Sequence, residues 1–250
     1  EDQRVLHATQ QIVSQKLAFP VLIGRPEVIE RRIKELGLTI QPGKDFELVN
    51  NQRDPRYREY WGEYYQSMKR KGITEEMARR RVIGNTTLIG ALMVNRGDAD
   101  AMICGTFGRY REHFDTIEQV IGYNNPEKVA GAMNALILPH GNIFITDTYV
   151  NAKPNAAQLA KITEMATEDM RRFGIEPKVA LMSNSNFGSI DNDTSRLMQE
   201  TLELVRAAQP DLEVDGEMQG DVALMEEMRR SILPDSTLTG SANLLVMPNV

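Results

Sequence analysis

The 250-residue sequence has few of the residues that build disulfide frameworks and histidine-based sites. It contains one cysteine, Cys104, one tryptophan and three histidines. A single cysteine excludes an intrachain disulfide and favours a reducing compartment, so we expect a cytoplasmic protein. Cys104 stands in an apolar run, which favours a small core residue over a nucleophile.

Long apolar runs and strong basic charge are also absent. No stretch approaches the length of a membrane span, and the start does not resemble a signal peptide. The formal net charge is -6, which argues against an electropositive groove for nucleic acid. With 41% hydrophobic and 26% charged residues, the composition favours a folded globular chain over a disordered one.

Common catalytic motifs are missing too. No G-x-G-x-x-G follows a predicted strand, and no P-loop, H-E-x-x-H or G-x-S-x-G is present. These absences argue against the commonest hydrolases and nucleotide enzymes, although a Ser–His–Asp triad without a local signature stays open. Asp215, Glu217 and Asp221 could be read as metal ligands, but carboxylates alone are weak evidence, and we expect no metal site.

Apolar runs alternate with helical stripes along the chain, which predicts a layered α/β fold with mainly parallel sheets. Strands are predicted at 19–24, 46–49, 99–104, 134–138, 142–148, 178–182, 212–218 and 243–247. The glycine turn between the fourth and fifth of these predicts one hairpin. Long helices are predicted at 54–71, which is rich in aromatic residues, and at 74–95.

We expect two α/β domains, at 1–125 and 126–250. The chain begins at Glu1 and stops soon after a strand-like run, and for that reason we expect it to be a piece of a larger polypeptide.

The stretch Ala99–His113 is the first candidate site. A predicted buried strand ends at Gly105 and opens into a loop that carries Arg109 and Tyr110. Ligands of α/β proteins bind at the carboxyl ends of strands, although an ordinary strand-to-helix connection would have the same pattern.

Two further loops follow predicted strands. Ser185, Asn186 and Ser189 lie in a loop rich in uncharged donors, which suits an anion or a pantetheine amide, or equally a cap for the next helix. In the other loop, Asp147 could bind a cation or ligand hydroxyls, but we favour a turn in which it accepts from its own backbone.

Arg79, Arg80 and Arg81 lie within one turn of a predicted helix. Most such runs are solvated surface, but guanidinium geometry would also suit a phosphate clamp.

Seven motifs resemble, in order, those of the phosphate acetyltransferase (phosphotransacetylase) family, and together they cover essentially the whole chain. They are RVLHATQQIV, FPVLIG, GALMVNRGDADAMICG, FITDTYVNAKP, VALMSNSNFGS, VDGEMQGD and SANLLVMPN. More narrowly, DPRYREYW, CGTFGRYREHF, SNFGS and DGEMQGD resemble the phosphotransacetylase-like C-terminal domain of bacterial multidomain NADP-dependent malic enzymes.

The resemblance implies two three-layer αβα domains with a cleft between them, as in isocitrate and isopropylmalate dehydrogenases. It implies that CoA and acetyl phosphate meet in the cleft, that the chains form homodimers or higher homo-oligomers, and that a segment beyond residue 250 completes the first domain. It also implies an N-terminal malic enzyme domain in the same chain, which uses NADP and a divalent metal.

The sequence departs from the family pattern in the first candidate site. Active members tend to read S-G-A-x-H-S/T-T-x-D there, whereas this chain, aligned on Gly105, has Cys104 before it and Gly108, Arg109 and Tyr110 after it. Asp115 falls about where the family has an arginine, and a carboxylate there would repel acetyl phosphate.

The departure suggests a domain that binds acetyl-CoA without transferring the acetyl group and that inhibits the distant malic enzyme site. In this hypothesis Arg79, Arg80 and Arg81 are the candidates for binding the CoA phosphates. The candidates for the rest of the acetyl-CoA site are Arg109, Tyr110, Ser185, Asn186 and Ser189. One alternative is an active phosphate acetyltransferase. Another is a structural dimerisation module, motivated by the aromatic stripe Tyr57–Tyr65.

Overall fold

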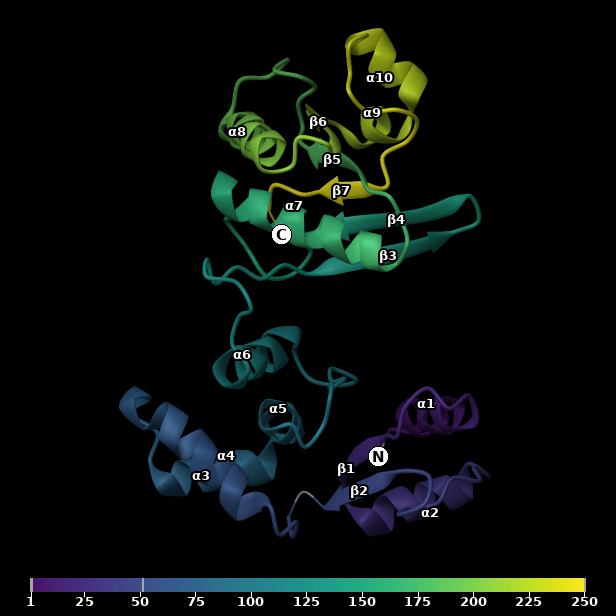
Figure 1. Cartoon of the computed structure of the whole chain (residues 1–250), viewed down its shortest axis with the longest axis vertical. Coiled ribbons are helices and arrows are strands. Elements are labelled where there is room, and N and C mark those ends of the chain that lie inside the picture. Colours follow the sequence, from purple (N-terminus) through teal and green to yellow (C-terminus); the bar gives the residue numbers. More distant parts are fainter. Residues whose placement is uncertain (1, 51, 250) are drawn as a thin grey trace. The chain divides into compact units, whose positions relative to one another are not determined.

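The computed structural model describes residues 2–50 and 52–249. The chain divides into two compact units, Glu1–Gly122 and Tyr123–Val250 (Figure 1). Each unit combines helices with strands that pair mainly in parallel, which confirms the predicted α/β class. Within the described residues, no helix has both the length and the apolar character that a bilayer crossing requires.

The first unit contains a two-stranded parallel sheet, in which Val21 to Gly24 align with Glu47 to Asn50. Its elements are α1 (Gln3–Ser14), β1 (Val21–Gly24), α2 (Pro26–Glu35), β2 (Glu47–Asn50), α3 (Tyr57–Met68), the 3-10 helix η1 (Lys69–Lys71), α4 (Glu75–Gly84), α5 (Thr86–Arg96) and α6 (Tyr110–Val120).

The aromatic stripe of α3 belongs to the core of the first unit. Tyr57, Tyr60 and Tyr64 are buried and pack with apolar side chains of α4 and α5. The Tyr60 hydroxyl donates to the Asp98 carboxylate over 3.0 Å, which satisfies its polar end. Three of the five aromatic side chains of the stripe therefore belong to the core, whereas Trp61 and Tyr65 are partly buried.

Two predictions for the first unit are wrong. The single helix at 74–95 is two helices, because the Asn85 side chain accepts from the Leu88 N–H over 3.0 Å and begins α5 anew. The buried strand at 99–104 is an irregular exposed segment, in which Ile103 is 96% exposed and Cys104 is also exposed. A strand needs a hydrogen-bonded neighbour, and in the described part of this unit only β1 and β2 pair.

The second unit is built on a five-stranded sheet of order β3-β4-β7-β5-β6. Only β3 runs antiparallel to its neighbour, and the turn between Leu138 and Gly141 confirms the predicted hairpin. The elements are β3 (Met133–Leu138), β4 (Gly141–Thr146), α7 (Ala156–Arg172), β5 (Lys178–Met182), α8 (Asp193–Ala208), β6 (Glu213–Met218), α9 (Gly220–Leu224), α10 (Glu226–Ile232) and β7 (Leu244–Val246).

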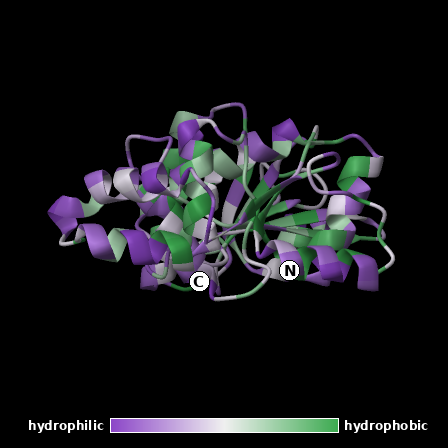
Figure 2. Ribbon diagram, turned by 90° about the horizontal axis from the view of Figure 1, so that it is seen from below, coloured by the Kyte–Doolittle hydropathy of each residue, from purple (hydrophilic) through white to green (hydrophobic). Residues whose placement is uncertain are grey.

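Alternation along the strands explains the layers of the second unit. Val179 and Leu181 face α7 and α8, whereas Ala180 and Met182 face α9 on the other side of the sheet. Figure 2 shows the resulting pattern, with hydrophobic strands flanked by helices that carry hydrophilic residues. The second unit is thus a three-layer αβα arrangement. In the first unit, the two described strands do not form a sheet with such layers.

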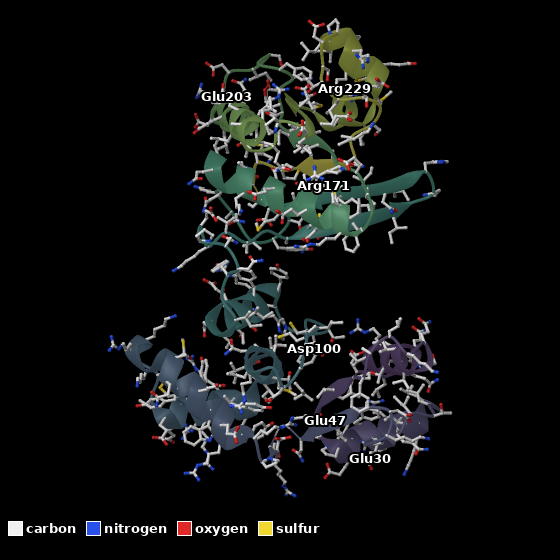
Figure 3. The ribbon with its side chains drawn as sticks, viewed as in Figure 1. Glu30, Glu47, Asp100, Arg171, Glu203 and Arg229 are labelled. Atoms are coloured by element: carbon white, nitrogen blue, oxygen red, sulfur yellow. The ribbon has the colours of Figure 1, made fainter. Side chains whose placement is uncertain are left out.

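Arg229, labelled in Figure 3, fixes the helices on the second face of this sheet. It lies on α10 and is completely buried. Its guanidinium donates to four backbone carbonyls, those of Val222, Ala223, Leu238 and Gly240, over 2.6 to 3.2 Å. A buried cation is tolerated here because these oxygens replace its water.

Candidate ligand-binding site

The loop from Gly105 to Arg109 presents a cation and an aromatic ring to solvent. Gly105 and Gly108 have φ angles of 95° and 93°, which glycine adopts without strain. The Arg109 side chain is 86% exposed and lies 3.9 Å from Glu112. Tyr110 stacks on Phe114, with ring centroids 6.2 Å apart. Such a surface suits a ligand that carries both phosphate and an apolar or planar group.

His113 holds this loop from the first turns of α6. Its Nε2 lies 2.7 Å from the Phe107 carbonyl oxygen and its Nδ1 lies 2.8 Å from the Thr87 hydroxyl. Arg4 donates to the Thr106 carbonyl over 3.1 Å. His113 was not among the residues predicted for the site, although Gly108, five residues earlier, leaves room for its ring.

Asp115 is paired with a cation of its own helix. Arg111 Nε lies 2.7 Å from the Asp115 carboxylate, and the same guanidinium lies over the Phe114 ring. The acidic charge that departs from the family pattern is therefore partly neutralised, although the pair is exposed to solvent and weak.

The three arginines of α4 point in different directions. Successive residues of a helix are rotated by about 100°, so neighbours in the sequence do not share a face. Arg80 pairs with Glu76 over 2.5 Å, whereas Arg81 donates to the Tyr64 hydroxyl over 3.2 Å. Arg79 is exposed. A single phosphate cannot be gripped by all three side chains at once in this conformation.

The serine-rich loop after β5 is held together by its own hydrogen bonds. Ser185 is fully buried, and its hydroxyl lies 3.3 Å from that of Ser189 and accepts from the Ile190 N–H over 3.0 Å. Asn186 donates its N–H to Ser189 and accepts from the Gln219 N–H. Ser189 is exposed. The loop is preorganised, and Ser185 acts within it and does not face solvent.

Glu217 anchors this loop from beneath. It is completely buried on β6. Its carboxylate accepts from the Gly188 N–H over 2.9 Å and from the Gln199 amide over 3.3 Å, while its carbonyl accepts from the Phe187 N–H over 2.7 Å. From the sequence, Glu217 was only a weak candidate for a metal ligand, because a contact with a distant loop leaves no local pattern.

Asp147 organises the loop after β4, as favoured from the sequence. It is buried, and its Oδ1 accepts from the N–H groups of Ala132, Tyr149 and Val150. Its Oδ2 accepts from the Asn151 N–H over 2.7 Å. Burial raises the pKa of Asp147, but these hydrogen bonds outweigh it and bring the pKa below the ordinary value.

Asp215 also serves the protein frame. Its carboxylate accepts from the Ser236 hydroxyl over 2.7 Å, from the Thr237 N–H over 2.9 Å and from Arg206 over 3.1 Å. In the described part of the chain, no three His, Cys, Asp or Glu side chains are grouped so that they could hold a metal ion.

The eight sequence candidates thus fall into three groups on separate elements. Arg109 and Tyr110 lie together at the start of α6, the arginines 79–81 diverge from α4, and the residues of the third group share the loop 183–189. The first and third groups are the ones whose geometry is fixed by neighbouring hydrogen bonds.

Comparison with known proteins gives consistent relatives along the whole chain. The profile of the family "Phosphate acetyl/butaryl transferase" matches residues 1–250. The NADP-dependent malic enzyme of Escherichia coli (strain K12) is 61% identical over 250 residues, which are 100% of this chain and 33% of that protein. The chain therefore spans about a third of the length of the malic enzymes that it matches.

Phosphate acetyltransferases match as well. That of Corynebacterium glutamicum is 31% identical over 254 residues, covering 100% of this chain and 75% of that protein. A phosphotransacetylase structure from Streptococcus pyogenes superposes with a TM-score of 0.88 at 26% identity, covering 100% of this chain and 75% of the other.

Proposed function

The chain belongs to the phosphate acetyl/butaryl transferase family, and on that premise we propose that it is the regulatory, phosphotransacetylase-like domain of a cytoplasmic NADP-dependent malic enzyme. The neighbouring malic enzyme domain would use NADP and a divalent metal to convert malate to pyruvate by oxidative decarboxylation. The domain described here would bind acetyl-CoA as an allosteric inhibitor, without transferring the acetyl group, and would mediate oligomerisation.

The loop Gly105–Arg109 and the start of α6 carry this proposal. Where active members of the family have small hydroxyl residues, this chain places Arg109 and Tyr110, both on the surface and both at the end of a glycine loop. Guanidinium and phenol groups bind phosphate and adenine well but do not shape a tight cradle for a phosphoryl group in transfer. Retained family motifs combined with an altered loop support ligand binding without catalysis.

Inhibition from this domain requires two states of the whole enzyme that differ in affinity for acetyl-CoA. Calorimetry on the full protein should detect acetyl-CoA binding, and rising acetyl-CoA should lower malic enzyme activity. Arg109→Glu should raise the acetyl-CoA concentration for half-inhibition at least about tenfold, since it removes a charge-assisted contact. Arg172→Glu, an exposed arginine of the second unit, is the matched control. The absence of acetyl-CoA binding would refute the proposal.

An active phosphate acetyltransferase is the main alternative. It is favoured by the relatives of that name and by the partial neutralisation of Asp115. A coupled assay for acetyl phosphate formed from acetyl-CoA and phosphate decides between the two, because steady turnover by the full protein would overturn the regulatory proposal.

The proposed oligomerisation is supported by β3, the edge strand of the second unit. Ile137 is 85% exposed, and Leu136 and Leu138 are exposed as well. No described strand covers the outer side of β3, and the hairpin extends beyond the other strands (Figure 1). An apolar open edge is a template for strand pairing.

A second copy of the chain is the partner that fits this edge. Met133–Leu138 contains no charged residue, so an antiparallel pair of two β3 strands about a two-fold axis would bring no like charges together. Ile137→Lys should shift the sedimenting species toward the monomer, whereas Ile232→Lys, at an exposed apolar residue of α10, should not. Unchanged sedimentation of the Ile137→Lys protein would contradict this surface.

A further inference from the structure

His113 is hydrogen-bonded at both ring nitrogens, although no residue of its helix, α6, is fully buried. Its two partners come from different elements, because Phe107 lies in the glycine loop and Thr87 lies in the first turn of α5. Thr87 is buried and α5 is the most deeply buried helix of the first unit. The His113 ring therefore connects the exposed loop 105–109 to the buried helix α5.

The partners define which nitrogen carries the proton. A carbonyl oxygen only accepts, so the Nε2 that faces Phe107 must be protonated. In the neutral ring Nδ1 then accepts, and the Thr87 hydroxyl must donate to it. Thus the Thr87 hydroxyl donates to His113 Nδ1, and His113 Nε2–H donates to the Phe107 carbonyl.

Gly108 completes the arrangement. A Cβ atom at this position would lie 2.8 Å from His113 Nε2, and the φ angle of 93° favours glycine in addition. Only the absence of a side chain at 108 lets the imidazole approach the loop backbone closely enough to bond it. Gly108, His113 and Thr87 are therefore all needed for the contact that holds the loop.

We propose that His113 is a positioning residue: through Nε2–H to Phe107 and Nδ1 to Thr87, it fixes the loop 105–109 so that Arg109 and Tyr110 are presented to the ligand. The importance for acetyl-CoA rests on the proposed function, whereas the hold on the loop does not. His113 itself makes no contact with the ligand in this scheme, and its effect passes through the loop backbone.

Two isosteric substitutions separate the roles of the nitrogens in the full protein. His113→Gln places an amide N–H near the position of Nε2 and keeps the bond to Phe107, whereas His113→Asn reaches only the position of Nδ1 and loses it. His140→Gln, in the exposed hairpin turn, is the control. Loop mobility is measured as the rate of tryptic cleavage after Arg109, with cleavage after Arg196 in the same digest as the reference.

Loss of the hydrogen bond to the Phe107 carbonyl should speed cleavage after Arg109 by about tenfold in His113→Asn and weaken acetyl-CoA binding by a similar factor, with His113→Gln within about twofold of wild type. Equal cleavage in the Asn variant and wild type would overturn the inference. Gly108→Ala, in an exposed loop, should have the same effect as His113→Asn, and serves if the latter does not fold. If the wild-type protein does not bind acetyl-CoA, only the proposed function is refuted. The cleavage rates then still test whether His113 holds the loop.

Discussion

Asp147 offers a direct test of how much one buried carboxylate stabilises the second unit. Its Oδ1 accepts three backbone N–H groups and its Oδ2 accepts the N–H and the side-chain amide of Asn151. In Asp147→Asn the oxygen can keep the three bonds, but the new NH₂ group faces two donors. At roughly 1.5 to 3 kcal/mol for each charge-assisted bond, the loss of the two bonds from Asn151 should cost about 3 to 6 kcal/mol at neutral pH.

The loss should depend on pH in a defined direction. The folded-state pKa of Asp147 is lowered from 3.8, so its contribution is complete above the unfolded-state pKa and disappears as the pH falls through the folded-state pKa. The free-energy difference between wild type and Asp147→Asn should therefore be complete at pH values above the unfolded-state pKa and should shrink as the pH falls below it.

Urea unfolding followed by circular dichroism at several pH values measures this difference. Asp211→Asn, at an exposed position of the same unit, should unfold like wild type at every pH. A free-energy difference for Asp147→Asn that stays constant down to pH 3 would refute the assignment of the stability to the ionised carboxylate. So would unfolding at the same urea concentration as wild type at pH 7.

Three other substitutions test the packing of the second unit. Arg229→Met removes a guanidinium that donates to four carbonyls and should cost about 3 to 5 kcal/mol in urea unfolding; full recovery by Arg229→Lys would contradict this. Gly216→Ala should lower Tm in calorimetry, because its Cβ would lie 2.8 Å from the Leu181 carbonyl oxygen; an unchanged Tm would argue against it. Leu181→Ala should cost about 2 to 5 kcal/mol in urea unfolding, and a loss under about 1 kcal/mol would mean that this core relaxes freely.

The second unit could be predicted from the sequence because its central strands β5 and β7 are short apolar runs that are buried on both faces of the sheet. The strand Lys178–Met182 was predicted at its observed bounds, and the hairpin follows from Pro139-His140-Gly141 between two apolar runs. Such signals are local, and each strand finds its neighbours within the same unit. Local pattern and tertiary packing therefore agree.

The first unit was harder to predict from the sequence, because an apolar run there can form a strand or remain an irregular segment. Residues 99–104 have the composition of a buried strand, yet composition reports only what a segment would gain by burial and not whether a partner strand is present. By contrast, the start of α5 could have been predicted, because asparagine is a favoured N-cap residue and Asn85 accepts from the Leu88 N–H. The apolar helical pattern continues through this position and favoured a single helix instead.

The candidate site shows the same division between local and distant signals. Arg109 and Tyr110 could be found because they interrupt a family motif, but the residues that hold them in place could not, since Thr87 lies 26 positions before His113 in the sequence. Gly108 and His113 are a pair that the sequence could have indicated. A glycine just before a helix leaves space for a histidine in the first turns of that helix to contact the loop backbone. The serine loop of the second unit bonds to itself through Ser185 and Ser189, whereas the loop 105–109 accepts hydrogen bonds from Arg4 and His113, which lie outside it. The loop 105–109 is thus held by contacts between residues far apart in the sequence, which no local sequence pattern reports.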